Sequence, residues 1–588
     1  MKRVLITSLI TAGIMIAVIT TVIVVLSKNE ANKAVTSELD LISETQGKED
    51  FDTGSSRKLR IGKDGEILFF GDRKVADVYN KKKENKISAK IERLKKQKHY
   101  TFEDPLFIWN PYGTNDLSMH YSFRDDASTY IKYTIQIDDE DIPDFTRVLN
   151  THTEGNVTRN HEYILTGFVP GYQNKLIIRR YYANGKLASK EYYEFYVDEL
   201  SEAVKTKISY NEIRNTSKIS NGLYAICGYQ AGKTNAPAVI PFYDNSGILR
   251  SVIPLENYRT DRIEFVNGNM VYSYSNKGFA VVAPNGKLVK VLSLRNYRLH
   301  HDFVYNGYGQ LWCLASDTNQ RNTEKDCVIS VNMDSGKIKK LVDFGTLLSG
   351  VKNAAAKADS ARPLNWLELN SIVRVGSSDI IVSSRELSTI IRVNSVTSSY
   401  PKLGYLISDS AIWEKTKYQK YLLTKGAYVD EKWYNLNDHS QSTDKGEVRD
   451  FCTQFGQNSV SCVQSSQLAE EQYYLTMLNN NYGFASTLPN VKWSAFAGIG
   501  RRGRDADCSH FYEYIVDEKA GYYGLHRSFG VPYTAQGGSA SRNGSNIIIG
   551  SMNGKSFGEY DENGRLIREF SLKAYRVYKY DLKNYWFY

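Results

Sequence analysis

Six polar side chains lie in short turns at or beside strand-like segments, and their types suit the binding of an anion. Imidazole can act as a nucleophile or a proton donor, and guanidinium can bind two oxygens of a sulfate, phosphate or carboxylate at once. Each residue alone has an ordinary interpretation, such as a loop histidine bonded to backbone or an arginine in a surface ion pair. Together they are a candidate site if the fold brings them close. They are His300, His301, Glu368, Asn370, Arg385 and Asn458.

A repeated unit of about 40 residues begins near residue 206 and predicts such a fold. Each unit has short apolar strands joined by turns such as Asn-Gly, as in "FVNGNMVYSYSNKGFAVVAPNGKLVKVLSL", and these turns tolerate positive φ. Six such units predict a six-bladed β-propeller over residues 206–588. The inner strands of a propeller start close to its axis. We therefore expect the entry turns, with their polar side chains, to meet at one end of the central channel.

Residues 100–205 carry alternating aromatic and β-branched runs, separated by Asn, Gly, Pro and Asp. This pattern predicts a small antiparallel β-sandwich that precedes the propeller. The predicted fold class is therefore all-β, with a six-bladed β-propeller, a small N-terminal β-sandwich and a membrane anchor before them.

The anchor is predicted from the uncharged run between Val4 and Leu26, which is long enough to cross a bilayer core of roughly 30 Å as a helix. We interpret residues 1–26 as a single transmembrane signal-anchor, with the folded domains on the extracytoplasmic side of the cell membrane. A cleaved signal peptide is the alternative. Residues 27–99 are interpreted as a linker that ends in a basic amphipathic helix. That helix is either a solvated stalk or a contact for anionic lipid or envelope polymer.

The charge and the cysteines narrow the function classes. The formal net charge is +10, but Lys81–Lys98 alone holds nine Lys or Arg against two Glu. The folded domains are therefore nearly neutral, which argues against a nucleic-acid partner. Export would permit disulfides, and we predict the pairs Cys313–Cys327 and Cys452–Cys462, with buried free thiols as the alternative. No Cys and His spacing indicates a metal site.

One glycine-rich segment is a weak match to a dinucleotide-binding motif. It is "GIGRRG", Gly498–Gly503, and the motif requires a strand before it and a helix after it. The residues that follow, "RDADCSHFYEY", do not indicate a helix. We therefore expect no dinucleotide cofactor.

Several longer segments resemble the bacterial arylsulfate sulfotransferases that do not use the nucleotide sulfate donor. They include "DPLFIWNPYGTNDLSMHYSF", "HHDFVYNGYGQLW", "DIIVSSRELSTIIRV" and "SHFYEYIVDEKAGYYGL", and the likeness covers roughly residues 100–588. The resemblance implies a six-bladed propeller with an N-terminal sandwich. It also implies transfer of a sulfuryl group from a phenolic sulfate ester to a phenol through a sulfohistidine. No metal or other cofactor is implied.

The family's site residues carry over unevenly. The His-His-Asp motif is present at His300 and His301, the oxyanion-binding asparagine is Asn370, and the strand-end arginine is Arg385. Glu368 stands where the family has a histidine, and Asn458 stands where the family has its nucleophilic histidine. Three interpretations follow from the sequence: a transferase with a replaced or relocated nucleophile, a non-catalytic propeller that binds an anionic aromatic or other small ligand, and a structural propeller without a ligand.

Overall fold

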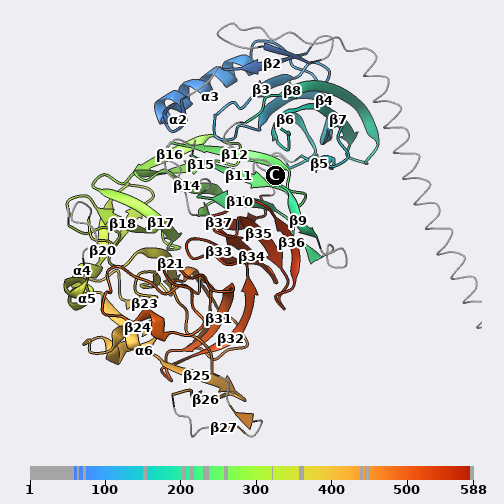
Figure 1. The fold of residues 1–588 in the computed structure, drawn as a ribbon. Helices are drawn as coiled ribbons and strands as arrows, with labels where there is room; N and C mark the ends of the chain where they lie inside the picture. The colour runs from blue at the N-terminus through green and yellow to red at the C-terminus, as the bar shows by residue number, and fades with distance from the viewer. Residues whose placement is uncertain are drawn as a thin grey trace, which may run out of the picture.

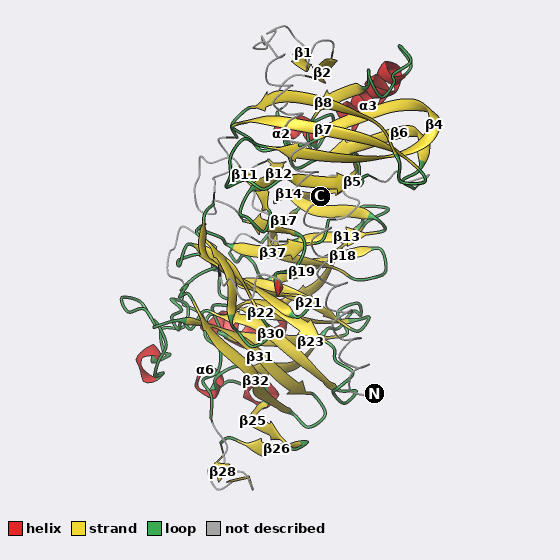
Figure 2. Ribbon diagram, turned by 90° about the vertical axis from the view of Figure 1, so that its right-hand side faces the viewer, coloured by secondary structure: helices red, strands yellow, loops and turns green. Residues whose placement is uncertain are grey.

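The computed structural model describes residues 58–61, 65–70, 74–149, 155–200, 206–211, 218–228, 238–256, 262–320, 322–356, 363–437, 442–443, 446–447 and 450–582. They form a smaller β-sheet domain stacked on a larger β-propeller (Figures 1 and 2). The predicted anchor, residues 1–26, lies outside the described residues. Within them, no helix combines the length and the apolar character needed to cross a membrane.

The N-terminal domain is one hydrogen-bonded sheet that folds back on itself. The first half of its long strand β4 pairs with β3 and β6 and the second half with β7 and β5, with an irregular register between Arg124 and Thr129. The two halves pack face to face, and the rings of Phe107 and Tyr193 lie 5.0 Å apart between them. The strands are β1 (Lys58–Ile61), β2 (Gly65–Phe69), β3 (Leu106–Trp109), β4 (Met119–Gln136), β5 (Phe145–Val148), β6 (Thr158–Leu165), β7 (Tyr172–Tyr182) and β8 (Leu187–Val197).

The segment before residue 100 is part of this domain and not only a linker, because β2 pairs in parallel with β3. Helix α2 (Val75–Val78) and the basic helix α3 (Lys81–Lys95) follow. Ile91 of α3 is buried against Leu106 and Ile108, and the Lys81 ammonium donates to the Leu288 carbonyl of the propeller over 2.6 Å. The basic helix is therefore a packed element between the two domains, which corrects the expectation of a solvated stalk.

The propeller has six blades in the described part of the chain, each a sheet of at least four strands, which confirms the predicted all-β propeller. Blades two to four are continuous in sequence. Their strands are β13 (Ile263–Val266), β14 (Asn269–Ser275), β15 (Gly278–Val282) and β16 (Leu288–Ser293); β17 (Tyr297–Tyr305), β18 (Gln310–Asp317), β19 (Cys327–Asn332) and β20 (Ile338–Asp343); β21 (Leu369–Val375), β22 (Asp379–Ser384), β23 (Thr389–Asn394) and β24 (Lys402–Ile407).

Blades five and six carry additional strands. Their four main strands are β29 (Asn458–Val463), β30 (Gln472–Asn479), β31 (Ser509–Asp517) and β32 (Tyr522–Val531); β33 (Ser539–Asn543), β34 (Asn546–Ser551), β35 (Ser556–Tyr560) and β36 (Leu566–Phe570). Short elements decorate the connections: α4 (Phe344–Leu347), α5 (Ser349–Ala354), α6 (Ser410–Trp413), β25 (Thr424–Val429), β26 (Lys432–Asn435), β27 (Ser442–Thr443) and β28 (Gly446–Glu447).

Blade one closes the ring with strands from both ends of the propeller sequence. Its outer strands are β10 (Leu223–Cys227), β11 (Ala238–Tyr243) and β12 (Leu249–Leu255), and its innermost strand is β37 (Arg576–Tyr580). Strand β9 (Ile208–Asn211) in turn extends blade six. A buried ion pair joins blades six and one, since the Lys579 ammonium lies 2.7 Å from the Glu559 carboxylate and the Tyr224 hydroxyl donates to the same carboxylate over 2.6 Å. This contact stabilises the closure of the propeller ring between blades six and one.

All six cysteines are free thiols, so both predicted disulfides are wrong. Cys313 and Cys327 lie in neighbouring strands but face Ile329 and Ala315 across the ladder, not each other. The Cys327 thiol donates to the Ala315 carbonyl over 3.0 Å, and both residues pack as small apolar core groups. Cys462 is in β29 opposite Leu475. The expected disulfides therefore no longer support the predicted extracytoplasmic location of the folded domains, which stays a prediction from the uncharged run at residues 4–26.

We expect Lys579→Met to destabilise the propeller by about 3–5 kcal/mol, because it leaves the Glu559 carboxylate buried without its counter-charge. Urea unfolding followed by tyrosine and tryptophan fluorescence measures the change. The double variant Lys579→Met, Glu559→Gln should recover part of the loss, and Lys573→Met, at an exposed position of the same connection, should have no effect. Equal stability of Lys579→Met and the wild type would show that the pair does not hold the closure.

Candidate functional site

Three of the inner strands, β17, β21 and β29, share an irregular backbone at the end of the central channel where the predicted site residues lie. The ladder register shifts between Leu299 and Phe303, between Leu369 and Ser371 and between Asn458 and Ser461. His301 and Ser459 have positive φ angles of 53° and 51° there. Such bulges re-aim side chains next to functional sites, at a local cost in backbone strain. The repeat at equivalent places indicates that one geometry is built several times.

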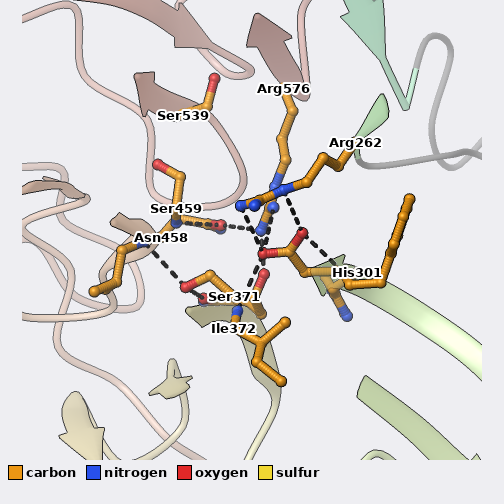
Figure 3. A network of polar contacts seen from close by, with 12 residues as sticks. Arg262, His301, Ser371, Ile372, Asn458, Ser459, Ser539 and Arg576 are labelled. Carbon is orange, nitrogen blue, oxygen red and sulfur yellow. Dashed lines mark hydrogen bonds and ion pairs between the residues drawn. The ribbon is translucent and has the colours of Figure 1, made fainter. Parts of the chain in front are cut away.

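A chain of hydrogen bonds runs from blade to blade at this level. In each, a side-chain oxygen at the start of one inner strand accepts from a backbone N–H of the next blade. The pairs are Asp302 with Ile372 N (3.1 Å), Ser371 with Val460 N (3.0 Å), Ser459 with Ala540 N (2.7 Å) and Ser539 with Val577 N (2.9 Å) (Figure 3). We call these four acceptors the capping ring. Each inner strand is the edge of its sheet, so the capping ring supplies acceptors for N–H groups on the side that has no partner strand.

Two arginines complete the ring at the positions of the remaining blades. Arg576 precedes Val577 and Arg262 precedes Ile263, so both stand where the other blades have serine or aspartate. The guanidinium of Arg262 lies 3.1 Å from the Asp302 carboxylate and that of Arg576 lies 3.6 Å from it. Asp302 and Arg576 are fully buried. The Glu264 carboxylate lies 3.4 Å from the Arg262 guanidinium, so this cluster holds two cations and two anions.

The residues immediately before the capping ring form a second level, and three predicted site residues occupy it. They are His301, Asn370 and Asn458, on three successive blades. Asn458 accepts a hydrogen bond from the Arg576 guanidinium over 2.9 Å, and the Asn370 carbonyl accepts another from the same group. The Asn370 amide donates to the Gln457 carbonyl over 2.7 Å. Arg576 therefore ties the two predicted amide residues to the central cluster.

His300, His301 and Glu368 form a contact chain beside this level. The two Nδ1 atoms of the histidines lie 3.1 Å apart, and Nε2 of His301 lies 3.5 Å from the Glu368 carboxylate. The Lys325 ammonium lies 3.1 Å from the same carboxylate. Glu368 is therefore compensated by a neighbouring cation. It is therefore not an isolated carboxylate, which would repel an anionic ligand.

The loop that carries Asn458 is fixed by hydrogen bonds to blade four and not by a disulfide. The Gln457 amide donates to Ser383 Oγ (3.0 Å) and to the backbone carbonyls of Ser384 (3.2 Å) and Thr389 (3.1 Å). Gly456, with φ of 63°, donates to Ser388 Oγ over 3.1 Å. These side chains are buried, so the bonds are shielded from water. They hold position 458 as rigidly as the predicted crosslink would.

Arg385 reaches the same end of the channel from the turn after β22. Its backbone N–H donates to the Glu368 carbonyl over 3.2 Å, and its guanidinium donates to the Ala535 carbonyl over 3.4 Å. The guanidinium also lies 5.7 Å from the centre of the Tyr482 ring. All six predicted residues therefore lie around one channel end. Arg385 is at its outer side, and Asn458 and Asn370 are at the axis.

The sequence reasoning missed Arg262 and Arg576. Both begin an inner strand, but neither stands in a motif, and β37 was not recognised as the inner strand of blade one. The alternating residues of "RVYKY" are typical of a strand. Its position after the last complete blade was the signal that it could complete blade one. In the described part of the chain, no group of three or more His, Cys, Asp or Glu is arranged to hold a metal ion.

We expect Asp302→Asn to destabilise the propeller by about 3–5 kcal/mol, because it takes the Asp302 counter-charge from the fully buried Arg576 guanidinium and leaves Arg262 with Glu264 alone. Denaturant unfolding measures the effect. Asp302→Asn combined with Arg262→Gln removes one of the two cations and should recover part of the stability. A single variant as stable as the wild type would contradict the central role of this carboxylate.

The model of the protein family "Arylsulfotransferase (ASST)" matches residues 209–573 of this chain. No curated protein is similar in sequence to this chain. Similar solved structures include the periplasmic gluconolactonase of Pseudomonas aeruginosa, with 9% identity, 76% of this chain and 98% of that chain covered, and a TM-score of 0.31. They also include BamB of Moraxella catarrhalis, with 7% identity, 66% and 95% covered, and a TM-score of 0.29. A protein of unknown function from Desulfotomaculum acetoxidans has 9% identity, 61% and 99% covered, and a TM-score of 0.33.

Proposed function

We propose that this chain, which belongs to the arylsulfotransferase family, binds aryl sulfate esters at the channel end and lacks efficient sulfuryl transfer. The observation that carries the proposal is the pairing of polar groups with aromatic rings. Arg385 lies over Tyr482, and the ring of His301 lies 6.3 Å from that of Tyr575. An aryl sulfate needs donors for its sulfate oxygens and aromatic surface for its ring. Both are supplied here within one set of neighbours.

The sulfate end of the ligand is best served by Arg385 and His301. A guanidinium group binds two sulfate oxygens in its own plane, which fixes the orientation of the ester. The aromatic end would lie against Tyr482 or Tyr575. This arrangement supports binding without any covalent step.

Asn458 is the reason for proposing little transfer. The nitrogen of a carboxamide shares its lone pair with the carbonyl, so it cannot attack sulfur as a neutral imidazole does. In addition, its carbonyl oxygen is engaged by Arg576 at 2.9 Å. The family reaction passes through a sulfohistidine, and position 458 is where the resemblance puts that histidine. The surrounding scaffold is otherwise intact.

A transferase with a relocated nucleophile is the second candidate, and the contact chain of His300, His301 and Glu368 favours it. If His301 donates from Nε2 to Glu368, its Nδ1 is an acceptor and accepts a hydrogen bond from the Nδ1–H of His300. Nε2 of His300 then carries a lone pair. In that case His300 Nε2 attacks sulfur, the bond from sulfur to the phenolic oxygen breaks, and a phenolate leaves. A phenol acceptor would then take the sulfuryl group from His300.

Arg385→Ala should weaken the binding of phenyl sulfate by about 1.5–3 kcal/mol, because a charge-assisted hydrogen bond is lost. Isothermal titration calorimetry measures the affinity. Arg374→Ala is the matched control, since Arg374 belongs to the same blade but lies toward the other end of β21. Unchanged affinity in Arg385→Ala would remove this residue from the sulfate site.

Asn458→His should restore transfer from 4-nitrophenyl sulfate to phenol, because it returns an imidazole to a position that the Gln457 bonds already fix. Since Lys325 compensates Glu368, the single variant should suffice, and Asn458→His with Glu368→His should add to the rate. Release of nitrophenol and a mass increase of one sulfuryl group on the histidine are the measurements. Asn458→Gln is the control and should stay inactive.

Turnover by the unmodified chain would contradict the proposal of a missing nucleophile and favour the second candidate. His300→Gln would then abolish the turnover, while Asn458→Ala would retain it. This pair of variants separates the two functions by the position of the covalent adduct.

A further inference from the structure

The segment that joins β30 to β31 carries three arginines on a tight hairpin near the channel end. Arg501 and Arg504 exchange two backbone hydrogen bonds, of 2.7 and 2.9 Å, with Arg502 and Gly503 at the tip. We call Arg501–Arg504 the arginine hairpin. It coincides with the glycine-rich segment that resembles a dinucleotide motif, but it opens no helix. Its glycines serve the turn, since Gly503 has a φ of 79°.

The hairpin is attached to the candidate site by three successive contacts. Gly500 donates to the Asn481 carbonyl over 2.8 Å and pairs with Tyr482 in an isolated bridge. Tyr482 lies under the Arg385 guanidinium, and its N–H donates to the Phe455 carbonyl over 3.2 Å, in the loop that leads to Asn458. The hairpin therefore begins one residue after Gly500, which pairs with Tyr482, the aromatic neighbour of Arg385.

The base of the hairpin also packs on a second tyrosine at this channel end. A Cβ at Gly500 would collide with the Tyr533 hydroxyl, so only glycine allows this close approach. Arg385 and Asp505 both influence the pKa of Tyr533, which burial raises. Tyr533 thus packs against the base of the hairpin at Gly500.

The arginines of the hairpin are available to a ligand. Arg502 and Arg504 are exposed and Arg501 is half-buried. Among the described residues, none of the three arginines has a guanidinium nitrogen within 4.0 Å of a carboxylate oxygen, although Asp505 and Asp507 follow in sequence. Residues 501–507 hold three arginines and two aspartates, a net charge of +1. The hairpin therefore presents guanidinium groups at the surface directly after Gly500, which pairs with Tyr482.

We propose that the arginine hairpin is a second anion subsite, so that the preferred ligands are aryl sulfates with a further anionic group on the ring. The inference rests on the proposed function, because it assigns the remote end of the same ligand. The sulfate would bind at Arg385, the ring would lie against Tyr482 or Tyr533, and the second anionic group would contact the hairpin. Guanidinium groups suit a sulfate or a carboxylate equally in this role.

The test compares phenyl sulfate with 4-carboxyphenyl sulfate and benzene-1,4-diyl bis-sulfate by calorimetry on the full chain. At low salt the wild type should bind the two doubly anionic ligands about five- to tenfold more tightly, as expected for a few partly exposed charge contacts. The variant Arg501→Gln, Arg502→Gln, Arg504→Gln should lose that preference and keep its affinity for phenyl sulfate. A rise in salt to about 0.3 M should reduce the preference in the wild type.

A matched control removes three exposed lysines at the opposite ends of blades four and five: Lys402→Gln, Lys432→Gln, Lys519→Gln. Its preference should equal that of the wild type. Equal affinity of the wild type for all three ligands, or a preference that persists in the arginine variant, would overturn the inference. Failure of phenyl sulfate to bind the wild type would refute the proposed function, and the second subsite with it, whereas phenyl sulfate binding without preference refutes the subsite alone.

Discussion

The constraint on which this propeller depends is the need to satisfy backbone N–H groups where the inner strands begin. Each inner strand is the edge of its sheet, so the N–H groups on its open side have no partner in the ladder. A buried donor without a partner costs about 1–3 kcal/mol. The capping ring supplies acceptors from the neighbouring blade. A local requirement for hydrogen bonds thereby becomes a contact between blades, and the blades are fixed in rotation around the axis.

The candidate site is a consequence of that arrangement. Because the capping ring fixes the first residue of each inner strand, the residues just before it are also fixed, and these are His301, Asn370 and Asn458. Arg576 belongs to the ring by position and contacts both amide residues. The same bonds that close the channel centre therefore orient the groups that a ligand would meet.

Much of this could be predicted from the sequence, because it is written in local patterns. Asn-Gly turns and short apolar strands repeat within each blade, and the polar entry turns with His301, Asn370 and Asn458 recur at the same point in the repeat. What could not be predicted depends on contacts distant in sequence. The pairing of β37 with β10 decides that Arg576 reaches the axis, and nothing near residue 576 announces it. The spacing of Cys313 and Cys327 likewise does not tell which residue each faces across the ladder. For α3, the charges were visible, but the fit of Ile91 against Leu106 and Ile108 was not.

The origin of β37 has a consequence for biosynthesis. Blades two to six can pair their own strands as they leave the ribosome, but blade one has no inner strand until residues 576–580 emerge. Until then the ring is open, the Glu559 carboxylate has no ammonium beside it, and the channel axis has only one of its two guanidinium groups. The nascent chain can thus contain almost every blade and still lack the Arg576 guanidinium that contacts Asn370 and Asn458. The arrangement at the channel end therefore forms only after β37 has left the ribosome and paired with β10.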